Sequence, residues 1–262
     1  MADGVGPRLF VRAHLAAGAT VELDHGQANY LGNVLRMKAG DPLLVFNGSD
    51  GEWQAVLNAR GRRGLVVTAE SQTRPQTPRP SLYYLFAPLK QGRLDYMVQK
   101  AVELGAGLMT PVITRHTQVT RVNVERMEAN AIEAAEQCGI LTIPQIDEPV
   151  PLGQLLDAWP ALESTRRIIY CDEATDSAGP VATLGGLGDV AYAVLVGPEG
   201  GFSAEERQRL RSLPFVTPLP LGPRILRADT AAVAALALVQ SVLGDWRSER
   251  PPGFERGQDA HR

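Results

Sequence analysis

The stretch LVGPEGGFSAEE, from Leu195 to Glu206, places three glycines and a carboxylate between an apolar run and the start of a helix. Glycine-rich loops in this position often hold a phosphate against their backbone amides. This loop has no lysine and has neither the G-x-x-x-x-G-K-[ST] nor the G-x-G-x-x-G spacing. Because Glu199 would repel a phosphate, the loop favours a neutral or cationic ligand, unless it is a tight turn that binds nothing.

A second stretch, PLPLGPRILRADTAA, begins at Pro218 and combines three prolines with two arginines. It is expected to be rigid and irregular, with Asp229 or Thr230 capping the helix that follows. Arginine suits the recognition of a carboxylate or a phosphate. Arg224 and Arg227 are therefore either solvated side chains of a loop or a second wall of the site that the glycine loop forms.

The elements around these stretches predict a mostly parallel α/β sheet, because strand and helix patterns alternate from Ser81 onward. Residues 8–70 instead predict a small β-rich unit, with one helix that Asp24 caps and that ends before Gly40. Three prolines within 71–80 indicate an extended linker. In the second part, strands are expected at 81–89, 109–114, 166–173 and 191–197, and helices at 92–107, 123–139, 203–213 and 229–244.

The composition limits the classes of function. The 262 residues are 44% apolar, without any run near the roughly 20 residues of a membrane helix. The first residues lack an apolar signal core, so a cytoplasmic protein is expected. A net charge of −3 argues against broad, non-specific nucleic-acid binding, although residues 1–80 carry nine basic against seven acidic side chains. Cys138 and Cys171 make no metal-binding spacing, so no metal is expected.

The two stretches, GPEGGFSAEE followed by LGPRILRADTAA, resemble motifs of the bacterial 16S ribosomal RNA uridine N3-methyltransferase family, within the SPOUT methyltransferases. KQGRLDYMVQKAVELG and AIEAAEQCG are similar to its central motifs, and VLRMKAGD and FNGSDGEW to its N-terminal domain. The resemblance extends to about Gly244. It implies S-adenosylmethionine-dependent methylation of N3 of one uridine of 16S ribosomal RNA, close to the decoding region of the 30S subunit.

The resemblance also implies a domain organisation. Residues 1–72 would form a PUA-like β-barrel that helps to hold RNA, and 73–80 a linker. Residues 81–246 would form a SPOUT α/β domain with a deep trefoil knot, followed by a flexible tail at 247–262. Family members are homodimers that associate through the SPOUT domain, with the catalytic sites near the interface.

In such a protein the two stretches bind S-adenosylmethionine, which has no phosphate and carries a sulfonium cation. Glu199 does not conflict with this ligand. The resemblance assigns cofactor binding to Val196, Gly197, Pro198, Gly200, Gly201, Leu219, Leu221, Gly222, Ile225, Leu226, Arg227 and Thr230.

Methyl transfer to uracil N3 requires a base that removes the N3 proton. The candidates are Glu199 and then Glu103, although either carboxylate could instead cap a backbone or pair with an arginine. Arg227 or Arg224 would stabilise a uracil oxygen as negative charge develops, or hold a neighbouring phosphate. RNA contacts are expected at Arg8, Arg12, Arg36, Lys38, Arg115, His116 and Arg224. A lone histidine such as His116 is more often structural, and Arg62 and Arg63 fit either an RNA contact or a solvated turn.

Three positions depart from the family pattern: Asn29 stands for a common histidine, Ile140 for an arginine and Asp229 for a glutamate. The change at Ile140 would weaken one RNA contact, and none of the three touches the cofactor loops. Two other functions stay open. The chain could be a tRNA ribose methyltransferase of the same fold, or a non-catalytic RNA-binding ribosome assembly factor that only binds the cofactor.

Overall fold

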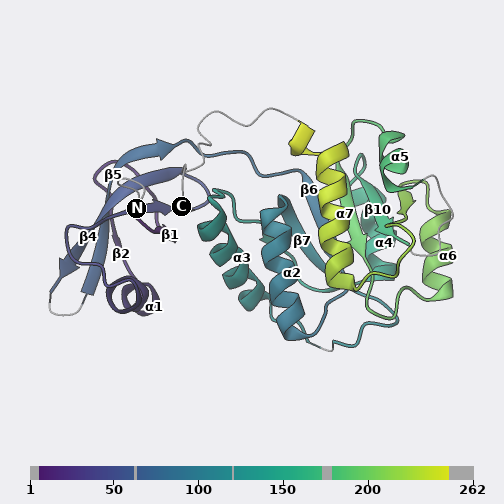
Figure 1. Ribbon diagram of the computed structural model, residues 1–262, viewed down its shortest axis with the longest axis horizontal. Helices are drawn as coiled ribbons and strands as arrows, with labels where there is room; N and C mark the ends of the chain where they lie inside the picture. Colours follow the sequence, from purple (N-terminus) through teal and green to yellow (C-terminus); the bar gives the residue numbers. More distant parts are fainter. Residues whose placement is uncertain (1–5, 62–63, 120, 173–178, 248–262) are drawn as a thin grey trace. The chain divides into compact units, whose positions relative to one another are not determined.

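The computed structural model describes residues 6–61, 64–119, 121–172 and 179–247, which divide into two compact units (Figure 1). One unit contains the chain up to Pro78 together with Ala135–Thr142. The other contains Arg79–Ala134 and the chain from Ile143 to Arg247. Arg62, Arg63 and, apart from Arg247, the predicted tail at 247–262 lie outside the described residues.

The first unit is built on a five-stranded sheet with the order β1-β3-β4-β5-β2. Its strands are β1 (Arg8–Phe10), β2 (Thr20–Glu22), β3 (Pro42–Phe46), β4 (Glu52–Arg60) and β5 (Gly64–Arg74). β1 and β3 are parallel, and the other neighbouring strands are antiparallel. β5 extends two residues into the segment predicted as linker. Apolar side chains of the strands and loops form the core, among them Leu9, Val11, Leu15, Leu31, Leu43, Val45, Leu57 and Val67.

The helix predicted to end before Gly40 is shorter than expected. Asp24 caps α1 (His25–Asn29), as predicted, and the structure adds a capping box with Gln27. The chain then continues as a π-helix, η1 (Tyr30–Val34). It leaves the helical path at Arg36, whose φ of 58° is left-handed. A left-handed residue ends a helix wherever it occurs, so the end comes four residues before Gly40.

Arg8 binds the end of α3 (Val124–Cys138) to the sheet within the first unit. Its Nε donates to buried Glu52 at 2.7 Å, and its Nη1 donates to the carbonyl oxygens of Ala135 and Glu136 at 2.5 and 2.9 Å. Arg74 donates to Glu52 and to the carbonyl of Gly139. These contacts place 135–142 in the first unit instead of the second, and they correct the assignment of Arg8 as an RNA contact, because its donors are used internally.

The second unit is built on a parallel sheet with the strand order β12-β10-β11-β6-β7-β8, and β9 also pairs with β7. The strands are β6 (Leu82–Phe86), β7 (Ala106–Ile113), β8 (Gln145–Ile146), β9 (Val150–Pro151), β10 (Arg167–Cys171), β11 (Tyr192–Val196) and β12 (Val216–Leu219). All five residues of β11 are buried, as expected of a central strand that is covered on both faces. The predicted α/β sheet is therefore confirmed.

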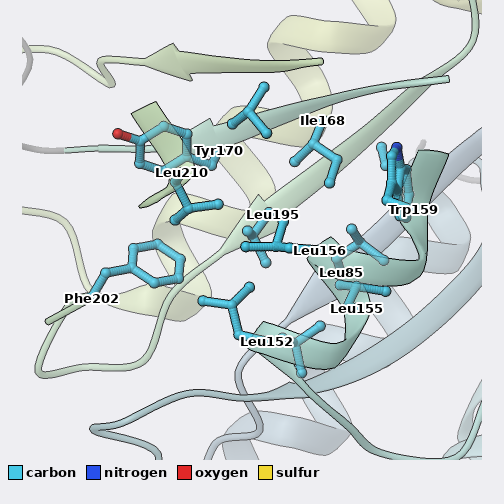
Figure 2. Close-up of a cluster of buried hydrophobic side chains, with 13 residues drawn as sticks. Leu85, Leu152, Leu155, Leu156, Trp159, Ile168, Tyr170, Leu195, Phe202 and Leu210 are labelled. Atoms are coloured by element: carbon cyan, nitrogen blue, oxygen red, sulfur yellow. The ribbon is translucent and has the colours of Figure 1, made fainter. Parts of the chain in front are cut away.

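Helices cover both faces of this sheet. On one face α2 (Gln91–Glu103) packs against α7 (Ala228–Val242), and α5 (Pro180–Gly185) also contacts α7 (Figure 1). On the other face α4 (Leu152–Leu162) and α6 (Ala204–Ser212) enclose an apolar cluster, in which Trp159 and Leu210 point toward Leu195 and Ile168 of the strands (Figure 2). α4 was not predicted from the sequence, because Gly153 and Pro160 interrupt its pattern.

We expect Arg8→Ala to lower the free energy of unfolding by about 2–4 kcal/mol, because it leaves a buried carboxylate and several carbonyls without one of their donors. Denaturant titration of the purified protein would measure this. Arg60→Ala is the matched control, since Arg60 pairs with Glu22 on the surface of the same unit, and such pairs contribute about 0–1 kcal/mol. Equal stability losses in the two variants would contradict the structural role of Arg8.

Candidate functional site

A cavity of about 240 Å³ lies at the edge of the second sheet where β10 and β11 end. It brings together the glycine loop, the proline-rich segment and the residues that follow β10. In parallel sheets, ligands bind outside the carboxyl ends of the strands, and this cavity occupies that position. Its walls are formed by Cys171, Asp172, Val196, Gly197, Pro198, Glu199, Gly201, Phe202, Arg207, Leu221, Gly222, Arg224, Ile225, Leu226, Arg227, Ala228 and Ala231.

The glycine loop is held in shape from both ends. A Cβ atom at Gly197 would lie 2.9 Å from the ring of Phe202, which is itself buried, so a side chain has no room there. Gly201 has a φ of 66° and donates its N–H to the carbonyl of Pro198 at 2.9 Å. Ser203 then caps α6 in a capping box with Glu206, as predicted. The loop therefore presents its backbone to the cavity in one conformation.

The proline-rich segment forms the opposite wall. The chain leaves β12 after Leu219 and turns at Gly222, whose φ is 96°. Ile225 is 85% exposed although it lines the cavity, and Arg224 and Arg227 are exposed beside it. The segment is less irregular than predicted, because residues 216–219 form an edge strand next to β10.

The start of α7 corrects a prediction from the sequence. The N-cap is Arg227, which has extended φ and ψ angles and makes no side-chain cap. Asp229 and Thr230 lie inside the first turn. The carboxylate of Asp229 adds a negative charge at the positive end of the helix and accepts the backbone N–H of Thr230 at 2.9 Å.

Asp172, which the sequence did not single out, is the most buried charged residue of the cavity wall, with 3% exposure. It accepts hydrogen bonds from the hydroxyl of Tyr170 at 2.8 Å and from Nη2 of Arg211 at 2.6 Å. Nε of Arg207 lies 3.6 Å away, at ion-pair distance. The feature of the sequence that could have identified Asp172 is its position directly after a buried strand. The arginines stabilise the carboxylate beside the cavity.

Glu199 is held by Arg93, another residue that the sequence did not indicate. Nη1 of Arg93, from the first turn of α2, pairs with a carboxylate oxygen of Glu199. Nε of Arg93 lies 3.9 Å from the carboxylate of Asp229. One guanidinium thus connects α2, the glycine loop and the start of α7. Arg93 was missed because the sequence shows it only as one of several polar residues on an amphipathic helix.

A small recess adjoins the cavity, and Pro198 and Glu199 line both. Lys90 and His116 also line the recess. Nδ1 of His116 lies 3.2 and 3.1 Å from the carbonyl oxygens of Gly200 and Gly201. Because carbonyls only accept hydrogen bonds, these contacts assign the proton to Nδ1 and leave Nε2 for other partners.

The structure brings most of the predicted ligand-binding residues to the cavity, but not all of them. Gly200 faces His116 in the recess, Leu219 is fully buried in β12, and Thr230 does not line the cavity. Glu103 lies at the last turn of α2, where its carboxylate accepts from Lys100 at 2.6 Å. Since Arg93 marks the end of α2 near the cavity, Glu103 is at the other end and is removed from the candidate bases.

Within the described ranges, no three His, Cys, Asp or Glu side chains are grouped so that they could hold a metal ion. None of the helices in those ranges has the length and apolar character needed to cross a membrane.

Two family models match the chain. The model of an RNA methyltransferase domain matches residues 75–240, and the model of an RNA methyltransferase PUA domain matches residues 23–70. The chain is 33% identical to the ribosomal RNA small subunit methyltransferase E of Rickettsia conorii, covering 89% of this chain and 94% of that protein. It is 32% identical to the Synechocystis protein of the same name, covering 90% of this chain and 78% of that protein.

Solved structures agree with these matches. A methyltransferase from Legionella pneumophila in complex with bound SAM superposes with a TM-score of 0.77 at 30% identity, over 91% of this chain and 98% of that one. The ribosomal RNA small subunit methyltransferase E of Neisseria gonorrhoeae, bound to S-adenosyl methionine, superposes with a TM-score of 0.78 at 28% identity. That superposition covers 92% of this chain and 99% of the other.

The thiol in the cavity wall should react slowly. Burial, with a smaller contribution from Asp172, raises the pKa of Cys171 to about 12. At pH 8 only about one molecule in 10⁴ carries a thiolate there, and the thiolate is the nucleophile. We expect negligible alkylation of Cys171 by iodoacetamide at pH 8, and a rise toward pH 10. Peptide mass spectrometry would compare it with exposed Cys138, and equal labelling of both at pH 8 would contradict the shift.

Proposed function

Because the chain belongs to the ribosomal RNA small subunit methyltransferase E family, we infer that it transfers a methyl group from S-adenosylmethionine to N3 of a uridine in 16S ribosomal RNA, the family position being U1498. The observation that carries this function is the convergence of the glycine loop and the proline-rich segment on one cavity at the carboxyl edge of the parallel sheet. The similarity to SAM-bound relatives extends over about nine-tenths of the chain.

The groups around the cavity fit S-adenosylmethionine. The ligand has an aromatic adenine whose faces suit apolar contacts, a carboxylate and two cationic centres, and it has no phosphate. Leu221, Ile225 and Leu226 offer apolar surface, while Arg224 or Arg227 suits the carboxylate. Glu199 would oppose a phosphate and does not conflict with a cation nearby. We propose that the backbone of the glycine loop, the apolar side chains and one of the two arginines hold the ligand.

When bound, S-adenosylmethionine supplies an electrophilic methyl group. We propose that Glu199 accepts the proton from uracil N3, because it lies on the wall shared by the cavity and the recess. Removal of this proton leaves the lone pair of N3 free to bond the methyl carbon, whose bond to the sulfonium sulfur would break and leave S-adenosylhomocysteine. Arg93 would keep the carboxylate oriented, and Arg227 would stabilise the charge that develops on a uracil oxygen.

The RNA contacts remain proposals for the exposed basic residues. Arg12, Arg36, Lys38, Arg115 and Arg224 are exposed, as is His116 beside the cavity. We propose that they contact the RNA of the 30S subunit, whose target base must leave its stack to reach the site. The homodimer through the SPOUT domain, the trefoil knot and the cytoplasmic location stay predictions.

Transfer of labelled methyl groups from S-adenosylmethionine to 30S subunits tests this function, with subunits from cells that lack the modification. Reverse-transcriptase arrest then locates the product, because N3-methylation blocks base pairing. We expect one strong stop at a single uridine of 16S RNA. Transfer to tRNA instead would favour a tRNA ribose methyltransferase, and cofactor binding without transfer to any RNA would favour a non-catalytic assembly factor.

Replacing the proposed base should affect turnover more than cofactor binding. We expect Glu199→Gln to lower kcat about 10²-fold or more while the Kd for S-adenosylmethionine changes little, because the amide keeps the shape but cannot take the proton. Glu103→Gln is the matched control and should behave as the parent, since Glu103 lies at the far end of α2. Single-turnover transfer and calorimetry provide the two measurements, and unchanged turnover in Glu199→Gln would exclude it as the base.

A side chain at Gly197 should weaken cofactor binding. Its Cβ would meet the buried ring of Phe202 at 2.9 Å, so the loop must shift away from its present path. We expect Gly197→Ala to raise the Kd for S-adenosylmethionine about tenfold or more. Gly185→Ala, at the end of α5, is the control because its Cβ meets no atom within 4 Å. Equal affinities of the two variants in calorimetry would show that the loop does not contact the ligand.

A further inference from the structure

The segment Tyr30–Lys38 of the first unit exposes several large apolar side chains to solvent. Tyr30 is 36% exposed, Val34 62% and Leu35 39%, while Leu31 from the same turns is fully buried in the core. The segment is therefore apolar on its outer as well as its inner side. Neighbouring exposed apolar side chains of this size mark a surface that binds a partner.

The backbone of this segment is unusual at the same place. Leu35 donates its N–H to the carbonyl of Tyr30 at 2.9 Å, which closes the π-helix, and Met37 donates to the carbonyl of Leu31 at 2.9 Å. Arg36 lies between these bonds with a φ of 58° and is the one non-glycine residue with positive φ among those described. Glycine normally fills this position because a Cβ is unfavourable there. The turn itself therefore does not require the arginine side chain.

The charge of the segment restricts the partner. No aspartate or glutamate occurs from His25 to Gly40, whereas Arg36 and Lys38 are both exposed. Neither side chain forms an ion pair within the part of the chain that the structure describes. A surface that combines an aromatic ring, aliphatic side chains and unpaired cations fits unpaired RNA, whose bases stack on apolar side chains and whose phosphates pair with cations.

We propose that Tyr30–Lys38 binds unpaired nucleotides of the substrate RNA, with a base stacked on Tyr30 and Leu35 and the adjoining phosphates held by Arg36 and Lys38. The inference rests on the proposed function in one respect only, namely that the bound RNA is ribosomal RNA. A duplex would use the cations but leave the apolar surface without a role. A second copy of the chain would bring two cationic segments together, which like-charge repulsion disfavours.

Arg36→Gly separates the role of the side chain from that of the backbone. Glycine adopts the left-handed conformation without a Cβ penalty, so the Tm should stay within about 3 °C of the parent. We expect the Kd for RNA to rise at least fivefold, and the slope of log K against log salt to fall by about one. Arg60→Ala removes one charge from the same unit and should change the Kd less than twofold.

Tyr30 tests the stacking contribution. We expect Tyr30→Ala to weaken RNA binding about tenfold, while Tyr30→Phe keeps the ring and stays within twofold of the parent. The probe is a fluorescent single-stranded RNA of mixed sequence, titrated with the whole protein in an anisotropy assay. The same strand annealed to its complement should bind more weakly and should not distinguish Tyr30→Ala from the parent.

Two results would overturn the proposal. One is an unchanged affinity for single-stranded RNA in both Arg36→Gly and Tyr30→Ala. The other is a lower oligomeric state of Tyr30→Ala in sedimentation, which would make the surface an interface between copies of the chain. Because these measurements need no turnover, a parent protein that binds RNA through the segment but transfers no methyl group would refute the proposed function alone.

Discussion

The parallel direction of β10, β11 and β12 is the constraint on which the site depends. Parallel strands end at one edge of a sheet, so the residues after each of them meet there. Asp172 follows β10, the glycine loop follows β11, and the proline-rich segment follows β12. The cavity is thus a consequence of strand order and direction, and its chemistry comes from loops that contribute little to the core.

Arg93 connects these loops to the helices. Its guanidinium pairs with Glu199 and lies near Asp229, so the position of the proposed base depends on α2 and on the start of α7 together. α2 and α7 are in turn joined at their other ends, where the side chain of Gln240 donates to the carbonyl of Leu104 at 2.7 Å. A change in the packing of either helix would therefore move the carboxylate of the proposed base.

Local signals in the sequence predicted much of the fold and part of the site. The N-cap at Asp24, the capping box at Ser203 and the apolar run of β11 were recognisable because each depends on a few neighbouring residues. Long-range contacts could not be recognised in this way. From the sequence Arg8 was expected to be available to RNA, whereas in the structure it donates to Glu52 and to carbonyls of α3. Asp172 and Arg93 were missed for the same reason.

Other departures have a backbone origin. The sequence placed the end of the first helix at a glycine, the usual residue for a left-handed turn, but the structure turns at Arg36. The sequence also predicted that Asp229 or Thr230 caps α7, whereas the N-cap is Arg227, which makes no side-chain capping bond. In both cases an arginine occupies a position that a glycine or a capping residue normally fills, on a surface proposed to bind a ligand.

If the glycine loop and the proline-rich segment form one cofactor site, S-adenosylmethionine should protect both of them. Hydrogen–deuterium exchange of the whole protein with and without the ligand measures this protection. We expect the ligand to slow exchange in residues 196–203 and 221–228 together and to leave Tyr30–Lys38 unchanged. Protection of only one of the two loops, or protection confined to other parts of the chain, would contradict a single shared site.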